Sequence, residues 1–180
     1  MKRFIAIMAL ALVGLVRADD KKDVVVELDD LKAKAPADWV SEKTTGEFRV
    51  YQFRIPKAED DKDDGELVIY SGNLGPDKAN LQRWKDSFQP PEGKKIDDVT
   101  KESNPKIGGY EAVMLQLEGT YKARERPGDP SSKLILKPDY KFTGIILKTK
   151  NQTYYIKFTA PAKTMEKHEK AFKAWLEALK

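Results

Sequence analysis

The clearest strand pairing in this chain is predicted for residues 142–160, which read FTGIILKTKNQTYYIKFTA. Residues 142–148 and 153–160 are rich in β-branched and aromatic side chains and alternate in the manner of strands. The polar residues 150–152 between them suit the turn of a hairpin. The sequence therefore predicts an antiparallel β-hairpin here.

A helix is predicted to follow this hairpin and to run to the C-terminus. Pro161 ends the second strand, and Thr164 is a candidate N-cap. One face of the helix is apolar, and its members are Met165, Phe172, Trp175, Leu176 and Leu179. Because this face is continuous, we expect it to dock on the sheet.

A long strand is predicted upstream over residues 110–121, because a glycine turn at 108–109 precedes it and its apolar residues alternate. The next stretch, 122–138, contains three prolines and a glycine, so we expect a loop. This loop has five basic and two acidic residues, which makes it the one basic loop of the chain. Arg124 and Arg126 are its candidate binding residues for an acidic polymer or partner.

Shorter strands are predicted at residues 48–55 and 67–70, with extended pieces within 24–39 and a further strand at 97–102. Apolar side chains occur on both faces of 48–55. A strand of this kind is usually covered on both faces, so we expect cover on both.

The acidic stretch between two of these strands, Lys57–Gly65, invites a calcium interpretation. If Asp60 is placed at position 1 of an EF-hand loop, position 3 is Lys62 and position 12 is Ser71, neither of which fits. We therefore expect a solvated loop without a metal, and no cofactor.

A helix is also predicted over residues 77–88, where Leu81, Trp84 and Phe88 fall within an arc of roughly 60°. This narrow stripe should lie on the sheet.

Beside this stripe, Asn80, Arg83 and Ser87 form a polar row that could border a groove. Arg83 is the first candidate, because a guanidinium ordered beside Trp84 still offers a fork of donors to a carboxylate or a phosphate. The alternative is structural, with Asn80 bonded to the preceding loop and Arg83 paired with an acid.

Residues 1–18 have the order of a secretory signal peptide, with two basic residues, an uncharged apolar run at 4–16 and then small residues. At ~1.5 Å per residue this run spans about 20 Å as a helix, short of the roughly 30 Å hydrocarbon core of a bilayer. We expect cleavage after Ala18 and no stable membrane insertion afterwards. The alternative is an uncleaved anchor, because Arg17 lies between the two small residues.

Composition excludes several classes of function. With no cysteine and one histidine, His168, the chain cannot form disulfides, thiolate zinc sites, cysteine nucleophiles or metal sites with two imidazoles. His168 lies on the apolar face of the last helix, where a half-buried structural role is favoured. Three of the 33 lysines and arginines precede residue 19, so cleavage leaves 30 against 29 acids and a net charge of +1. This balance argues against nucleic acid as a partner.

Three features together resemble the PsbP-like superfamily, in its exported bacterial branch: Pro36-x-x-Trp39, Asn80-x-x-Arg83-Trp84 and the final amphipathic helix. The resemblance covers Leu31–Lys180. It implies an α+β fold, an α/β/α sandwich with a mostly antiparallel sheet covered by helices on both faces. It also implies a non-catalytic module that acts by binding.

We therefore divide the chain into a signal peptide at 1–18, a charged lead with a candidate first strand at 19–30, and a single domain at 31–180. The favoured function is an exported binding or assembly module, periplasmic or secreted, with an envelope or secreted protein as its partner. The alternative is an envelope-polymer hydrolase with paired carboxylates, but the acids cluster in a loop and on solvent-facing helix positions rather than in a rigid cleft. A domain that simply protects or bridges other exported proteins is a further possibility, and the sequence cannot distinguish it from the binding or assembly module.

Overall fold

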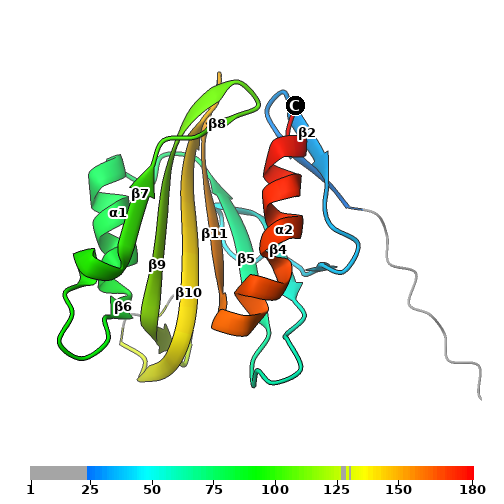
Figure 1. Ribbon diagram of the computed structural model, residues 1–180. Helices are drawn as coiled ribbons and strands as arrows, with labels where there is room; N and C mark the ends of the chain where they lie inside the picture. The colour runs from blue at the N-terminus through cyan, green and yellow to red at the C-terminus, as the bar shows by residue number, and fades with distance from the viewer. Residues whose placement is uncertain (1–23, 127–128, 130) are drawn as a thin grey trace, which may run out of the picture.

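The hairpin predicted at residues 142–160 is present and lies within the main sheet as strands β10 (Leu134–Lys148) and β11 (Thr153–Pro161) (Figure 1). The structure, a computed structural model, describes residues 24–126, 129 and 131–180. The signal peptide predicted at 1–18 lies outside the described residues.

The main sheet has nine strands, all paired antiparallel, and its central path runs β3-β4-β5-β11-β10-β9-β6. Two further short strands, β7 and β8, also pair with β9, while β1 and β2 form a separate hairpin. The remaining strands are β1 Val25–Leu28, β2 Leu31–Lys34, β3 Val40–Ser41, β4 Arg49–Ile55, β5 Gly65–Ser71, β6 Phe88–Gln89, β7 Thr100–Ser103, β8 Lys106–Ile107 and β9 Tyr110–Arg124. The helices are α1 Asp77–Asp86, α2 Ala162–Ala178 and a short 3-10 helix at Ile96–Val99.

Two hydrophobic clusters hold the helices to the sheet, and alternate residues of β10 contribute to each. Ile145 and Leu147 belong to the cluster that contains the apolar residues of α2, whereas Phe142 and Ile146 pack with Trp84 of α1. Figure 1 shows α1 and α2 on either side of these strands. The mostly antiparallel sheet with two helices confirms the expected α+β class.

The apolar face predicted for the last helix is confirmed, since all five of its members are buried. Its aromatic rings interlock with those of other elements. The ring centroids of Trp39 and Trp175 are 5.4 Å apart, and those of Phe158 and Phe172 are 5.2 Å apart. Aromatic pairs at such separations stabilise a core beyond the area that they bury.

Helix α1 approaches the sheet closely because Gly144 has no side chain. A Cβ added at Gly144 would lie 2.5 Å from a ring carbon of Trp84. The glycine on β10 therefore provides the space in which Trp84 packs, and it fixes the height of α1 above the sheet.

The loop predicted at 122–138 was wrong at both ends. Strand β9 continues through Arg124 and β10 begins at Leu134, so the two strands extend as a ribbon beyond the point where β11 stops pairing. Pro138 lies at a register shift between Lys137 and Tyr140, next to Asp139 with its positive φ of 56°. A proline is tolerated at such a bulge because no ladder hydrogen bond requires its missing N–H.

Three smaller predictions were also wrong in part. The stretch 97–102 begins as the 3-10 helix and becomes a strand only at Thr100. Helix α1 ends at Asp86, so Phe88 belongs to β6. The side chains of Phe48 and Val50 are exposed, so the expected cover on both faces is missing at the start of β4 and at the residue before it.

The start of α2 differs from the prediction as well. Pro161 occupies the N-cap position, and Thr164 lies within the first turn. The backbone N–H and the hydroxyl of Thr164 both donate to the Asp61 carboxylate, at 2.7 and 2.6 Å. The carboxylate of a distant loop thus caps the helix in place of a local side chain.

Candidate functional site

The predicted residue Asn80 is buried and holds the turn before α1. Its side-chain amide nitrogen lies 3.0–3.2 Å from the carbonyl oxygens of Leu74, Gly75 and Pro76. This is the bond to the preceding loop that the structural alternative expected.

Arg83 lies on α1 and Ser87 is the C-cap residue of this helix, and the two differ in how many of their hydrogen-bond donors are already used. The Ser87 hydroxyl donates to the carbonyl of Trp84 at 2.6 Å, which closes the end of α1. One terminal nitrogen of Arg83 donates to the carbonyl of Leu74 at 2.9 Å and to the side chain of Asn80. The other nitrogens of this exposed guanidinium have no hydrogen bond to a described residue, so Arg83 keeps donors for a ligand.

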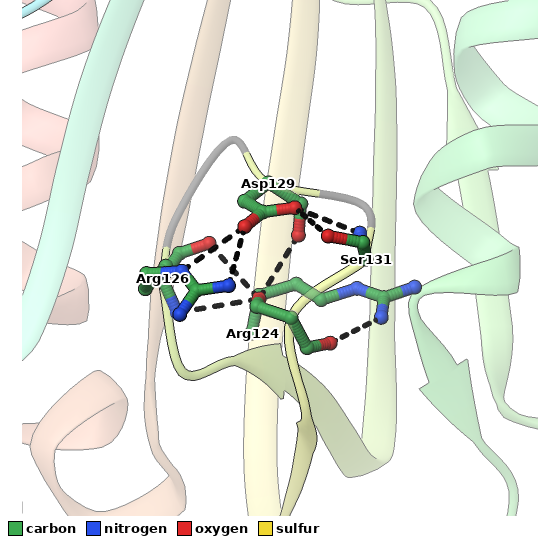
Figure 2. Close-up of polar contacts among 5 residues, drawn as sticks. Arg124, Arg126, Asp129 and Ser131 are labelled. Carbon is green, nitrogen blue, oxygen red and sulfur yellow. Dashed lines mark hydrogen bonds and ion pairs between the residues drawn. The ribbon is translucent and has the colours of Figure 1, made fainter.

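Arg124 and Arg126 lie at the end of the β9–β10 ribbon, where both make contacts within the ribbon (Figure 2). Arg124 donates to the carbonyl of Ser132 at 2.7 Å. Arg126 donates to the Asp129 carboxylate through two nitrogens, at 3.0 and 2.8 Å. The charge of Arg126 is thus matched by an acid, whereas Arg124 contacts only a carbonyl group, so Arg124 is the more available of the two for an acidic ligand.

The two predicted groups lie on neighbouring elements, but their arginine side chains are directed to different partners, Arg83 to Leu74 and Asn80 and Arg124 to Ser132. The N–H of Lys122 on β9 donates to the carbonyl of Ser87 at 2.9 Å, so the end of α1 lies against the ribbon. Arg124 follows two residues later on β9, whereas Arg83 lies one helical turn before Ser87.

The ribbon also exposes three consecutive apolar side chains that the sequence analysis did not single out. Leu134, Ile135 and Leu136 are 44%, 41% and 56% exposed, and we call these residues the apolar edge. On one side this segment pairs with β9, and on the other no described strand pairs with it, because β11 ends at Pro161, opposite Tyr140. The run Leu-Ile-Leu between Lys133 and Lys137 could have indicated a strand here, but the prolines on either side of it favoured a loop.

A groove of about 650 Å³ lies on the α2 face of the sheet, and none of the five predicted binding residues lines it. Its apolar and neutral lining includes Met114, Gln116, Thr143, Met165, Phe172 and Leu176. Two lysines at its rim are paired with acids, Lys141 with Glu166 at 2.8 Å and Lys173 with Glu169 at 2.6 Å. These four charges are therefore already matched, which leaves them little selectivity for a charged ligand.

The acidic stretch Lys57–Gly65 is largely exposed, as expected of a solvated loop, but several of its carboxylates contact other elements. Besides the contact of Asp61 with α2, Asp60 pairs with Lys163 at 2.7 Å. Asp63 accepts hydrogen bonds from Lys137 and Tyr140, and these lower its pKa. Within the described residues, no group of three or more acids or histidines could hold a metal ion.

His168 is 1% exposed, and both of its ring nitrogens have partners. Nε2 lies 2.8 Å from the carbonyl oxygen of Pro56, and Nδ1 lies 3.2 Å from the Asp38 carboxylate. The side chain thus ties α2 to the segments at Asp38 and Pro56, and it is more completely buried than we expected.

Comparison with known proteins places the fold. No protein-family model matches the sequence, and neither does any curated protein. Among solved structures, the chain resembles cyanobacterial PsbP (CyanoP) of Synechocystis sp. PCC 6803, with a TM-score of 0.50 and 9% identity over 96% of this chain and 97% of the other. The chain therefore has a PsbP-like fold, as the sequence resemblance predicted.

Two weaker likenesses accompany this one. LpqN, involved in cell envelope biogenesis of Mycobacterium tuberculosis, has a TM-score of 0.47 and 14% identity over 87% of this chain and 88% of its own. A Pseudomonas aeruginosa protein of unknown function has a TM-score of 0.47 and 12% identity over 88% of this chain and 96% of its own. At 9% identity, the likeness to cyanobacterial PsbP concerns the fold alone.

Proposed function

We propose that this chain is an exported, non-catalytic binding or assembly module that docks an extended segment of a protein partner on the apolar edge. The observation that carries this proposal is the exposure of Leu134, Ile135 and Leu136 on an edge that no described strand covers. An unpaired strand edge offers backbone donors and acceptors to an added strand, and alternating side chains then give selectivity.

The charge of the ribbon indicates what kind of segment would fit. Leu134 is paired with Arg124 across the ribbon, and Leu136 is paired with Lys122. Residues that are directly paired across two strands lie on the same face of the sheet, so this face combines leucines with basic side chains. A partner strand with apolar and acidic side chains complements it, and complementary charges speed association and fix the register.

The contacts of the acidic loop support a non-catalytic role. A hydrolase with paired carboxylates needs one desolvated acid at a set distance from a second one. Here Asp60, Asp61 and Asp63 each contact a lysine, a tyrosine or the start of α2 instead. These contacts give the carboxylates structural partners.

We also infer that the layers form the α/β/α sandwich implied by the resemblance. Alternate residues of β10 contact the clusters of α1 and α2, which supports helices on opposite faces.

Neither helix among the described residues is long and apolar enough to cross a membrane.

Export through cleavage after Ala18 completes the proposal. An intact-mass measurement on protein from the native host should give a chain that begins at Asp19. A retained Met1 would contradict export by cleavage.

Docking can be tested with a photo-crosslinking amino acid at Leu136 and, as a matched control, at Val25, an exposed apolar strand residue of the separate β1–β2 hairpin. We expect an envelope or secreted protein to be captured from position 136 alone, through a segment with apolar and acidic residues. A synthetic peptide of that segment should then bind the wild type and lose more than tenfold in affinity on Leu134→Ser/Leu136→Ser, because a buried leucine contributes about 1.5–3 kcal/mol.

Val25→Ser should leave the affinity for this peptide unchanged. Equal capture from both positions, or equal binding of the peptide by the double variant, would contradict the proposal. A third outcome would also contradict a protein partner. If no protein is captured, and if the wild type but not the double variant binds anionic lipid vesicles, the apolar edge binds a membrane instead.

A further inference from the structure

A lysine on a central strand has unusual surroundings on the α1 face of the sheet. Lys157 of β11 is paired with Gly144 on one side and with Val68 on the other. Directly paired residues share a face of the sheet, and Trp84 of α1 lies above Gly144. Lys157 is therefore directed to the α1 face, where it lies partly buried beside the helix.

Two basic groups approach the same aromatic ring. The Nζ atom of Lys157 lies 5.8 Å from the ring centroid of Tyr70, and the guanidinium carbon of Arg49 lies 5.5 Å from it. Arg83 on α1 donates to the carbonyl of Leu74, whose N–H donates to the hydroxyl of Tyr155, two residues before Lys157 on β11. Two cations, from β4 and β11, thus flank the Tyr70 ring, and a third, Arg83, lies on the helix that covers the same face of the sheet.

The acids near this group do not match the cations. No described residue forms a hydrogen bond or an ion pair with Lys157 Nζ. Glu66 is the acid whose charge acts on Lys157, but its side chain is half exposed and lies 3.9 Å from Arg49. One half-exposed carboxylate therefore acts on two of these cations, Arg49 and Lys157.

The electrostatic consequence is visible at Lys157. Burial lowers the pKa of its ammonium group, and the charges of Arg49 and Arg83 lower this pKa further, while Glu66 acts in the opposite direction. A buried cation without a counter-ion costs free energy, and an anion from solution can remove this cost.

We propose that Lys157, Arg49 and Arg83 bind the oxyanion group of a small molecule, a phosphate or a carboxylate. Lys157 supplies the point charge at the floor of the site. The nitrogens of Arg83 without a hydrogen bond supply directed donors, and Arg49, which lies over the Tyr70 ring and uses one nitrogen for Gln52, supplies a second guanidinium. This site shares no residue with the apolar edge, so the two proposals can fail separately.

The first test is a titration of the full chain with inorganic phosphate and, separately, with acetate, at pH 7 and constant ionic strength. Amide chemical shifts in β5, β11 and α1 should change and saturate with one of the two anions, and the tighter one identifies the oxyanion. Lys157→Met, which keeps the length of the side chain without its charge, should weaken this binding at least tenfold. Lys170→Met, at an exposed lysine of α2, is the matched control and should bind as the wild type does.

A second measurement separates an anion site from a structural lysine. In buffer without the anion, Lys157→Met should melt at a higher temperature than the wild type, because it removes an unmatched cation. Added anion should raise the melting temperature of the wild type and leave that of Lys157→Met unchanged.

If Lys157→Met does not fold, Arg49→Gln and Arg83→Gln provide the same comparison, and each should weaken binding at least threefold. Shifts that do not saturate with either anion would overturn the proposal. Equal affinity in the wild type and in these charge-removing variants would also overturn it.

Discussion

Trp175 allows the two contributions of a buried tryptophan to be separated, its volume and its indole N–H. The side chain is 2% exposed and packs against Trp39 and Phe172, with ring centroids 5.4 and 6.0 Å away. Its indole nitrogen is buried and has no hydrogen-bond partner in the described structure. Trp175→Ala removes both the volume and the N–H, whereas Trp175→Phe keeps most of the volume and removes only the N–H.

The expected magnitudes differ clearly. Truncation of a core tryptophan to alanine costs about 3–5 kcal/mol, a large part of the roughly 5–15 kcal/mol that holds a domain folded. Trp175→Phe leaves a smaller cavity, and it relieves an unpaired buried N–H that costs about 1–3 kcal/mol. The two effects oppose each other, so we expect Trp175→Phe to lie within about 1.5 kcal/mol of the wild type.

Urea unfolding followed by circular dichroism measures both free energies, and it should give a sharp transition for the wild type and Trp175→Phe. Trp175→Ala should lose most of its cooperative transition. If Trp175→Phe costs as much as Trp175→Ala, the indole N–H contributes to stability and the reasoning is refuted. A wild-type transition in Trp175→Ala would place α2 outside the core.

Three further predictions concern the capping, the packing and the pH dependence of the fold. Asp61→Ala should lower the free energy of unfolding by about 1–3 kcal/mol in urea titrations, because it removes the acceptor of two hydrogen bonds at the start of α2. Glu59→Ala, in the same loop, is the control and should have no measurable effect. Gly144→Ala should cost about 1–3 kcal/mol in the same assay, since its new Cβ would meet the Trp84 ring; an unchanged midpoint would show that α1 can shift at no cost. The lowered pKa of Asp63 means that its contribution to stability is present above about pH 4 and is lost as the pH falls through the folded value. The advantage of the wild type over Asp63→Asn, below about 1 kcal/mol for this half-exposed pair, should therefore shrink as the pH is lowered below about 4, and an advantage that does not change with pH would contradict this.

Local periodicity was sufficient to predict the hairpin at 142–160 and the apolar face of α2. In both cases a regular repeat of apolar residues extends over several turns or strand residues, and the flanking punctuation agrees with it. The ribbon was missed for the opposite reason. Its prolines indicate a loop locally, but Pro138 lies at a bulge, and only the pairing of Leu134–Lys137 with β9 shows that the strand continues.

The candidate sites depended on contacts between distant parts of the chain, which no local pattern reports. Lys157, Tyr70 and Arg49 lie on three neighbouring strands, and the order of those strands in the sheet brings them together. On α1 the sequence singled out the helix flank of Arg83 but could not show that Asn80 is committed to the preceding turn.

The loop Lys57–Gly65 ties the base of the ribbon to the rest of the fold, which bears on the proposed docking. Asp63 of this loop holds Lys137 and Tyr140 at the base of the ribbon, at 2.9 and 2.8 Å, while Asp61 caps α2. The same nine residues therefore join the ribbon to the helix that is anchored most deeply in the core. An edge that is ordered before it meets its partner loses less conformational entropy on binding, which raises affinity without any additional contact. Loosening the ribbon through Asp63→Asn should thus weaken the proposed docking even though Asp63 lies outside the apolar edge, and the peptide-binding assay would detect this as a faster dissociation rate.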